Sequence, residues 1–147
     1  MAEIADRTRV TAAPASVWAA IESPRTHATW HPFASEITGT HALGEVRECT
    51  VHVGGKLGTT RERCTTYDAG RAITWRIDED SSGFSRMVAD WTSGFRLDLD
   101  DGATLVTAWS DFQPKWFVRP ALPLIRRKFH QTQREILDRL RRYVEAT

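Results

Sequence analysis

The sequence contains no asparagine, only two cysteines, and no hydrophobic run long enough to cross a membrane. A membrane-spanning helix needs about 20 consecutive apolar residues, so we expect no integral membrane association. The absence of asparagine excludes N-linked glycosylation. No apolar segment typical of a secretory signal follows the first residues. We therefore expect a cytoplasmic protein.

The two cysteines are predicted to be free thiols. Gly54-Gly55 lies between two strand-like segments and indicates a two-residue hairpin turn. Opposed residues then have numbers that sum to 109, so Cys49 faces Thr60, and Cys64 lies four residues further along. The thiols would be about 13 Å apart, whereas a disulfide needs Cα atoms within about 7 Å. Free thiols are typical of a reducing compartment.

Charge of one sign is also scarce, since the net charge is +1 over 147 residues. This near-neutral total predicts no strong general attraction to nucleic acid or to anionic membranes. A hydrophobic content of 41% and a charged content of 27% are ordinary for a globular protein. The length suits a single domain, residues 1–147.

The longest periodic segment is the last one, residues 117–145. Apolar residues recur there at the spacing of one helix face, and these are Leu122, Ile125, Phe129, Ile136, Leu140 and Val144. Pro120 and Pro123 suit a first helical turn. The opposite face is charged and carries Arg126, Arg127, Arg134, Asp138, Arg141 and Arg142. A long helix with one apolar stripe needs a broad surface to lie on.

The residues before this helix are predicted to form that surface. Alternation predicts a first strand over residues 4–10, and proline signals predict short helices from Pro14 to Ile21 and from Ser23 to near Trp30. Six further strands are predicted, over residues 35–40, 45–53, 56–67, 71–77, 86–99 and 103–112. Their short connections indicate an antiparallel meander. The fold class is therefore α+β, with about seven strands in the order β-α-α-β6-α.

Several segments resemble one family. "TAAPASVWAAIESPRTHATWHPF", "RERCTTYDAGRAITWRI", "DDGATLVT" and "LDRLRRYVE" are similar to segments of the START/Bet v 1-like (SRPBCC) superfamily, in its polyketide cyclase/dehydrase-type branch. The resemblance covers nearly the whole chain. It implies a helix-grip fold, in which a curved sheet wraps around the C-terminal helix and leaves an internal cavity. Cys64 and Thr66 depart from the aliphatic and acidic residues usual at these places.

Strand parity places one charged pair in that cavity. Cys49 and Val51 form the apolar face of their strand, and Arg47 shares it. The numbers of Arg47 and Glu62 sum to 109, so the two should stand opposite each other and point inward. Burying such a pair is costly unless polar groups compensate it. A bulge or register slip would instead give a surface ion pair worth under about 1 kcal/mol.

The same parity predicts a ligand-binding lining from the inward residues of the sheet and helix. These are Arg47, Cys49, Val51, Glu62, Cys64, Ile73, Trp75, Trp91, Phe95, Val106, Ile125 and Phe129. The alternative is that the aromatic residues simply fill a core. Parity gives two different results near residue 90. Pairing across the turn at Ser81-Ser82-Gly83 points Asp90 inward, whereas alternation counted back from Leu97 points Trp91 inward. A bulge would reconcile the two.

Other motifs favour ordinary structure. His27 and His31 have the spacing of helical metal ligands, but no third ligand follows, so we expect packing or surface histidines and no metal. The acidic residues before Gly83 lack the closing glutamate of a calcium loop. Gly54-Gly55-Lys56 lacks the residues of a phosphate loop. Arg126-Arg127-Lys128 is more typical of a solvated helix face than of membrane docking.

The sequence thus favours binding of a small hydrophobic, partly polar molecule such as a lipid, polyketide or aromatic metabolite, with no cofactor. The alternative is a polyketide aromatase/cyclase or dehydratase. Its acid–base candidates are Glu62 as base, Arg47 as enolate stabiliser, and Tyr67. A third possibility is a regulatory protein with a vestigial cavity. Trp116-Phe117 would be a gate or a hydrophobic plug. The pattern specifies neither the ligand nor an oligomeric state.

Overall fold

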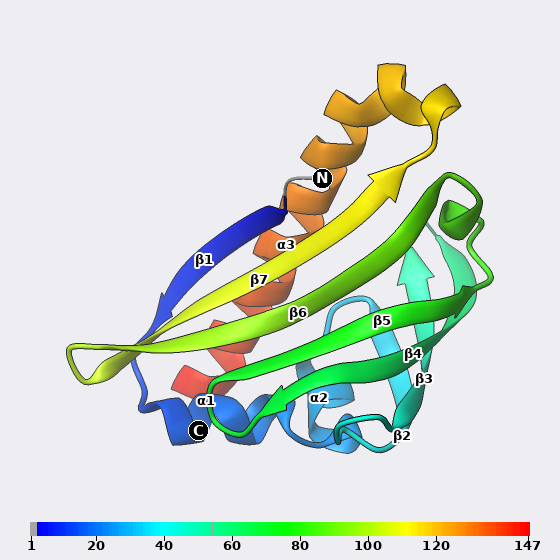
Figure 1. Ribbon diagram of the computed structural model, residues 1–147. Helices are drawn as coiled ribbons and strands as arrows, with labels where there is room; N and C mark the ends of the chain where they lie inside the picture. Colours follow the sequence, from blue (N-terminus) through cyan, green and yellow to red (C-terminus); the bar gives the residue numbers. More distant parts are fainter. Residues whose placement is uncertain (1–2, 54) are drawn as a thin grey trace.

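The computed structural model describes residues 3–53 and 55–147. Within these residues the chain forms one antiparallel sheet of seven strands in the order β1-β7-β6-β5-β4-β3-β2 (Figure 1). The strands are β1 (Ile4–Val10), β2 (Ala34–Gly39), β3 (Val46–Val53), β4 (Lys56–Asp68), β5 (Ala72–Asp80), β6 (Val88–Asp100) and β7 (Ala103–Pro114). Six consecutive strands therefore make the predicted meander, and β1 pairs with β7 at one edge.

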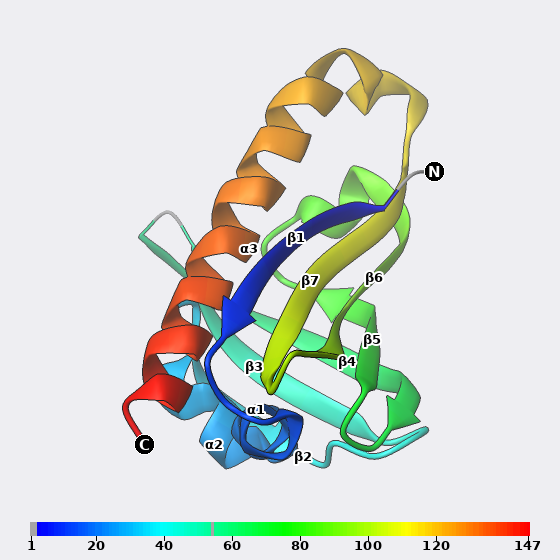
Figure 2. The ribbon, with the colours of Figure 1, turned by 90° about the vertical axis from the view of Figure 1, so that its left-hand side faces the viewer.

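Helices lie on one side of this sheet. They are α1 (Pro14–Ile21), α2 (Pro24–Trp30) and α3 (Leu122–Glu145), with 3-10 helices η1 (Phe84–Arg86) and η2 (Trp116–Ala121). Figures 1 and 2 show the sheet curving around α3, while α1 and α2 lie together at one end. The predicted α+β helix-grip fold is confirmed.

Local signals explain where the short helices begin and end. The side chain of Ser23 accepts a hydrogen bond from the Thr26 backbone N–H at 3.2 Å, and Pro24 occupies the first turn of α2. The helix ends at Trp30 because Pro32 disfavours helical geometry at His31, whose backbone is extended with ψ of 125°. This end places His27 and His31 beside the sheet.

The predicted boundaries need some corrections. The α-helix begins at Leu122 rather than at Pro120, since residues 116–121 form η2. Strand β5 continues three residues beyond the predicted end, to Asp80. Strict alternation from Glu62 and Cys64 predicts that Thr66 also points inward, but a register shift between Cys64 and Thr66 leaves Thr66 exposed. A bulge reverses the alternation that parity assumes.

The predicted register of the β3–β4 hairpin is confirmed. Arg47 pairs with Glu62, and Cys49 pairs with Thr60. Gly54, on which half of the predicted turn falls, lies outside the described residues. Both cysteines are buried free thiols. The predicted bulge near Asp90 is also present, because the register shifts between Ala89 and Thr92 and Asp90 has a φ of 53°.

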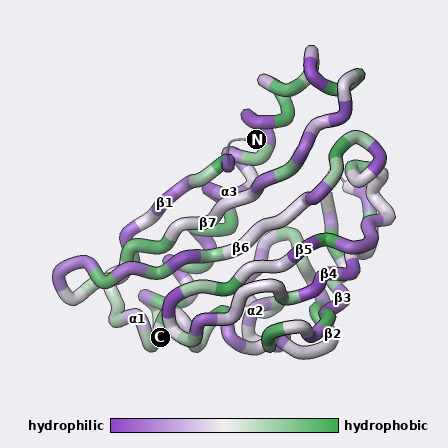
Figure 3. Tube along the Cα trace, viewed as in Figure 1, coloured by the Kyte–Doolittle hydropathy of each residue, from purple (hydrophilic) through white to green (hydrophobic). Residues whose placement is uncertain are grey.

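The core has two parts along α3. Around its C-terminal half, Leu137, Leu140 and Val144 pack on the central strands and α1. Around its N-terminal half, a smaller cluster holds Ile4, Val88 and Phe112 against partly buried aromatic side chains. The hydropathy trace contrasts these regions with the hydrophilic turn between β6 and β7 (Figure 3). The sequence pattern missed Leu137 and Gln133, both of which are buried.

Candidate functional site

Two hollows adjoin each other between α3 and the sheet. We call the first the inner cavity; it has a volume of about 170 Å³ and its walls include His27, His31, Arg47, Trp75, Phe95 and Gln133. We call the second the outer hollow; it has a volume of about 320 Å³ and is lined mainly by Phe84, Met87, Trp91, Ile125, Lys128 and Phe129. Trp91, Phe129 and Thr132 line both, so they form the partition.

Arg47 and Glu62 form a buried ion pair at the inner end of this space. The Nη2 and Nε atoms of Arg47 donate to Glu62 Oε1 at 2.8 and 3.0 Å. Thr60 donates its hydroxyl hydrogen to Oε2 at 2.6 Å. The two charged residues are only 7% and 8% exposed. Both carboxylate oxygens therefore have charged or polar donors, which offsets part of the desolvation cost.

The guanidinium of Arg47 is held on its other sides by aromatic rings. Its central carbon lies 3.5 Å from the centre of the Trp75 ring, which is cation–π geometry. Its Nη1 lies 3.0 Å from His41 Nε2 and 3.5 Å from His27 Nδ1. His27 in turn stacks on Trp30, with ring centres 4.9 Å apart. Arg47 is thus positioned by four neighbouring side chains.

These contacts determine the tautomers of the histidines. The backbone carbonyl of Ile21 can only accept, so the Nδ1 of His41, 3.0 Å away, carries the hydrogen. His41 Nε2 then accepts from Arg47. His31 Nδ1 accepts from the backbone N–H groups of Phe33 and Ala34 at 3.1 and 3.0 Å, which leaves its hydrogen on Nε2. Both rings are neutral in this arrangement.

The wall of the inner cavity contains buried donors that lack partners. His27 accepts through Nδ1, so its hydrogen lies on Nε2, and that atom is buried without a partner among the described residues. The indole Nε1 atoms of Trp75 and Trp91 are also buried without a hydrogen-bond partner among the described residues. All three residues line the cavity. Buried donors left unpaired are costly, so this wall is suited to a group that brings an acceptor.

Burial and the Arg47 charge set the pKa values of the cluster. Burial first, and then Arg47, lowers the pKa of His31 to about 3 and that of His41 to about 4. The same causes lower the pKa of His27 well below 6.5. Burial alone would raise the pKa of Glu62, but Arg47 and the Thr60 hydroxyl outweigh it and hold it below 4.5. The histidines are therefore neutral beside a charged pair.

The predicted lining residues divide among several places. Arg47, Trp75, Trp91, Phe95 and Phe129 line the inner cavity. Ile125 lines the outer hollow. Glu62 stands behind Arg47. The others pack away from the cavity, and these are Cys64, Ile73 and Val106 in the main core and Cys49 and Val51 in a cluster with Ala34 and Ile37.

Tyr67 lies apart from the other catalytic candidates. Its ring packs on Trp18 with centres 5.6 Å apart, at the α1 end of the core. Five residues of extended strand separate it from Glu62, which corresponds to about 17 Å. The structure therefore brings Arg47 and Glu62 together and leaves Tyr67 out of the group.

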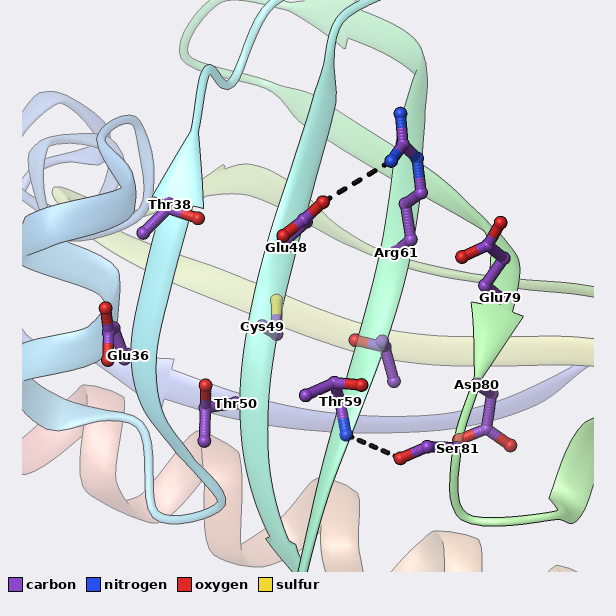
Figure 4. A pocket seen from close by; sticks show the side chains of 11 residues that line it. Glu36, Thr38, Glu48, Cys49, Thr50, Thr59, Arg61, Glu79, Asp80 and Ser81 are labelled. Carbon is purple, nitrogen blue, oxygen red and sulfur yellow. Dashed lines mark hydrogen bonds and ion pairs between the residues drawn. The ribbon is translucent and has the colours of Figure 1, made fainter.

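Another hollow lies on the outer face of strands β2 to β5 (Figure 4). It has a volume of about 480 Å³, and its walls are mostly polar, including Glu36, Glu48, Glu79 and Asp80. Glu48 and Arg61 form an exposed ion pair across it at 3.4 Å. Within residues 3–53 and 55–147, no three histidine, cysteine or acidic side chains are arranged to hold a metal ion.

The comparison with protein families agrees with this architecture. A family model described as polyketide cyclase / dehydrase and lipid transport matches residues 1–145. The chain belongs to this family. The resemblance to the START/Bet v 1-like superfamily is thereby confirmed. No curated protein matches the sequence.

Solved structures similar to this family member show the same fold at low identity. The aromatase/cyclase Zhui from Streptomyces sp. R1128 has 17% identity and a TM-score of 0.78, over 98% of this chain and 93% of that one. Ara h 8.0201 has 16% identity and a TM-score of 0.78, over 99% of both chains. XoxI from Bacillus cereus has 21% identity and a TM-score of 0.75, over 98% and 96%. At these identities the likeness establishes the fold alone.

Sequence reasoning missed most of the polar neighbours in this member of the polyketide cyclase / dehydrase and lipid transport family. His27 and His31 were expected only as packing or surface histidines, and His41 carried no signal at all. Gln133 was also missed; its side chain accepts from Ser110 at 2.8 Å and donates to Asp6 at 2.8 Å. The period of the α3 pattern, read with polar residues included, would have placed Gln133 on the buried face.

The ion pair predicts a large difference between two chemically identical substitutions. We expect Glu62→Gln to lower the free energy of unfolding by about 3 kcal/mol, because it leaves a buried guanidinium uncompensated. The control is Glu48→Gln on the adjacent, exposed rung, which should cost under about 1 kcal/mol. The double variant Arg47→Met/Glu62→Leu should recover most of the loss. Urea unfolding measures all three, and equal losses at positions 48 and 62 would refute the assignment.

The histidine cluster predicts loss of stability in mild acid. Between about pH 6.5 and 4.5 the unfolded chain takes up protons that His27, His31 and His41 do not take up when folded. The free energy of unfolding should then fall by up to about 1.4 kcal/mol per pH unit for each histidine. Below 4.5 the lowered pKa of Glu62 adds to the loss. Urea unfolding at several pH values measures this free energy. A value that does not change between pH 6.5 and 4.5 would contradict the lowered pKa values of the histidines.

A variant isolates one member of the cluster. In His41→Gln the amide can donate to the Ile21 carbonyl and accept from Arg47, but it does not titrate. We expect the slope of stability against pH to fall by about a third while stability at neutral pH changes little. An unchanged slope would show that His41 is not one of the titrating groups.

Proposed function

We propose that this protein binds a small, largely hydrophobic molecule in the inner cavity and the outer hollow. The observation that carries the proposal is the set of unpartnered donors on His27, Trp75 and Trp91, beside an aromatic wall. Membership of a family described as polyketide cyclase / dehydrase and lipid transport supports it. Two buried cysteines without a disulfide are compatible with action in a reducing compartment such as the cytoplasm.

The dimensions indicate how the ligand would divide between the two hollows. A cavity of roughly 150 Å³ accepts a benzene molecule, so the inner cavity of about 170 Å³ suits one ring. Ligand sites for larger molecules span about 300 to 1,000 Å³. The outer hollow, at about 320 Å³, would hold an apolar remainder. Because Trp91 and Phe129 form the partition, a longer ligand requires their side chains to turn.

The electrostatics favour an uncharged acceptor at the inner end. Arg47 is neutralised by Glu62 at 2.8 Å, and the histidines are neutral. A buried anion would therefore meet no free positive charge there. A carbonyl oxygen can accept from the ring N–H groups without bringing a charge. We therefore propose a ligand with a carbonyl-bearing ring and an apolar tail, such as an aromatic polyketide.

Binding is better supported than catalysis. A general base must lie within hydrogen-bond reach of the substrate, and the charge of Glu62 is already stabilised by hydrogen bonds from Arg47 and Thr60. Glu62 stands behind Arg47 rather than in the cavity wall. Tyr67 packs elsewhere, against Trp18. An aromatase/cyclase or dehydratase reaction would have to rely on Arg47 and the histidines alone.

The test uses an acetophenone with a para-propyl chain and the matched compound propylbenzene. Isothermal titration calorimetry should show the ketone binding about tenfold tighter or more, because its oxygen satisfies buried donors. Ala108→Leu, which fills the inner cavity, should abolish this binding. Ala89→Leu makes the same change on the exposed part of β6 and serves as the control. Equal affinities for the two compounds, or unchanged binding in Ala108→Leu, would refute the proposal.

A further inference from the structure

The segment between β7 and α3 exposes large hydrophobic side chains. Trp116 is 81% exposed, Phe117 is 52% exposed, and Leu124 in the first turn of α3 is 70% exposed. In η2 the buried residue is Val118, at 4%, so Trp116 and Phe117 are not the hydrophobic plug at the helix start that the sequence favoured over a gate. We call residues 115–129, which comprise Lys115, η2 and the first two turns of α3, the tip. Figures 1 and 2 both show it projecting beyond the sheet, at the end opposite α1 and α2.

The same segment concentrates positive charge. Between Phe112 and Arg134 lie five of the 20 Lys and Arg residues and none of the 19 Asp and Glu residues. The rest of the chain is therefore net negative, although the total is +1. The near-neutral total concealed this asymmetry. A local patch of one sign attracts an oppositely charged surface whatever the total charge.

The cations of the tip have no ion-pair partners in the described chain. They are Lys115, Arg119, Arg126, Arg127 and Lys128, and none of them lies within 4.0 Å of a described carboxylate. The C-terminal half of α3 is different, because Arg141 and Arg142 both bond to Asp138, at 3.0 and 3.1 Å. On α3 the unpaired cations therefore gather at the exposed apolar end, and Arg139 is the one further cation of this helix without an ion pair among the described residues.

We propose that the tip docks this protein onto an anionic lipid bilayer. Hydrophobic and hydrophilic residues are interspersed along it (Figure 3), and segments that lie in a membrane interface combine large apolar side chains with Lys and Arg. Arg127 and Lys128 follow Leu124 by three and four residues, so they neighbour it on the helix surface. Tryptophan favours the headgroup level, where its ring is apolar and its N–H is wet. The basic side chains can meanwhile contact phosphates.

Shape and composition favour a bilayer over other partners. A nucleic acid would use the cations but would leave Phe117 and Leu124 exposed to water. A stable protein interface needs about 800 Å² on each partner, whereas the tip is a narrow projection (Figures 1 and 2). A fluid lipid surface needs no complementary shape. Within the described residues no helix is long and apolar enough to cross a membrane, so the contact would be peripheral.

The inference goes beyond the proposed ligand binding and does not depend on it. Lys128 belongs to the tip and also lines the outer hollow, together with Ile125 and Phe129. The tip and the outer hollow therefore share one end of α3. Docking would bring this hollow to the membrane surface, where hydrophobic molecules partition. A failure of ligand binding would leave the membrane test unaffected, and the reverse also holds.

The test is co-sedimentation with phosphatidylcholine vesicles that contain or lack phosphatidylglycerol. We expect binding only to the anionic vesicles, weakened by high salt. Each tip charge contributes about fivefold, so Arg119→Gln/Arg126→Gln/Arg127→Gln should bind on the order of 100-fold more weakly. The matched control removes three exposed charges far from the tip, in Arg25→Gln/Arg71→Gln/Arg139→Gln, and should bind nearly as the parent does.

A second pair of variants tests the apolar contact. Trp116→Ala/Phe117→Ala should weaken vesicle binding by about tenfold or more, with thermal unfolding unchanged because both side chains are exposed. Leu99→Ala, which alters an equally exposed residue near the β6–β7 turn, is the control. The proposal is overturned if anionic vesicles do not bind, or if both tip variants bind as the parent does. It is also overturned if the tip variants instead convert a dimer to a monomer in light scattering.

Discussion

The buried pair of Arg47 and Glu62 constrains the rest of the cavity. Its carboxylate is satisfied by Arg47 and Thr60, and its guanidinium by Glu62, Trp75, His41 and His27. The residues involved come from α2, the loop before β3, and strands β3 to β5, so the pair joins these parts of the chain. Removing any one of them leaves a buried polar group without its partner, which costs more than the contact itself contributes.

The pair also determines the chemical character of the space next to it. Because its two charges cancel, the inner cavity has the polarity of neutral ring N–H donors rather than of an ion. Because Glu62 stands behind Arg47 and both its oxygens already accept hydrogen bonds, it is not part of the cavity wall. The outer hollow, by contrast, is lined by Phe84, Met87 and Ile125. This division supports recognition of a molecule with one polar end.

The cavity and the tip differ in how their charged groups are arranged. At the cavity, ionised groups are paired and buried, whereas at the tip four of the five cations are exposed and Trp116 and Phe117 stand beside them. At the cavity, pairing favours rigidity, since a buried ion pair has little freedom to rearrange. At the tip, exposure leaves the cations available to phosphate groups. The two regions meet at Lys128 and Phe129 on α3.

The sequence by itself determined the order of elements, the antiparallel meander, the long C-terminal helix and the β3–β4 register that opposes Arg47 to Glu62. These follow from local periodicity, turn residues and pairing parity, which act over a few residues. Only the tertiary structure decided that Thr66 turns outward at a bulge, that His27 and His41 contact Arg47, and that Tyr67 packs on Trp18. It also decided that Trp116 and Phe117 face solvent. Such contacts join residues far apart in the chain, and no local pattern encodes them.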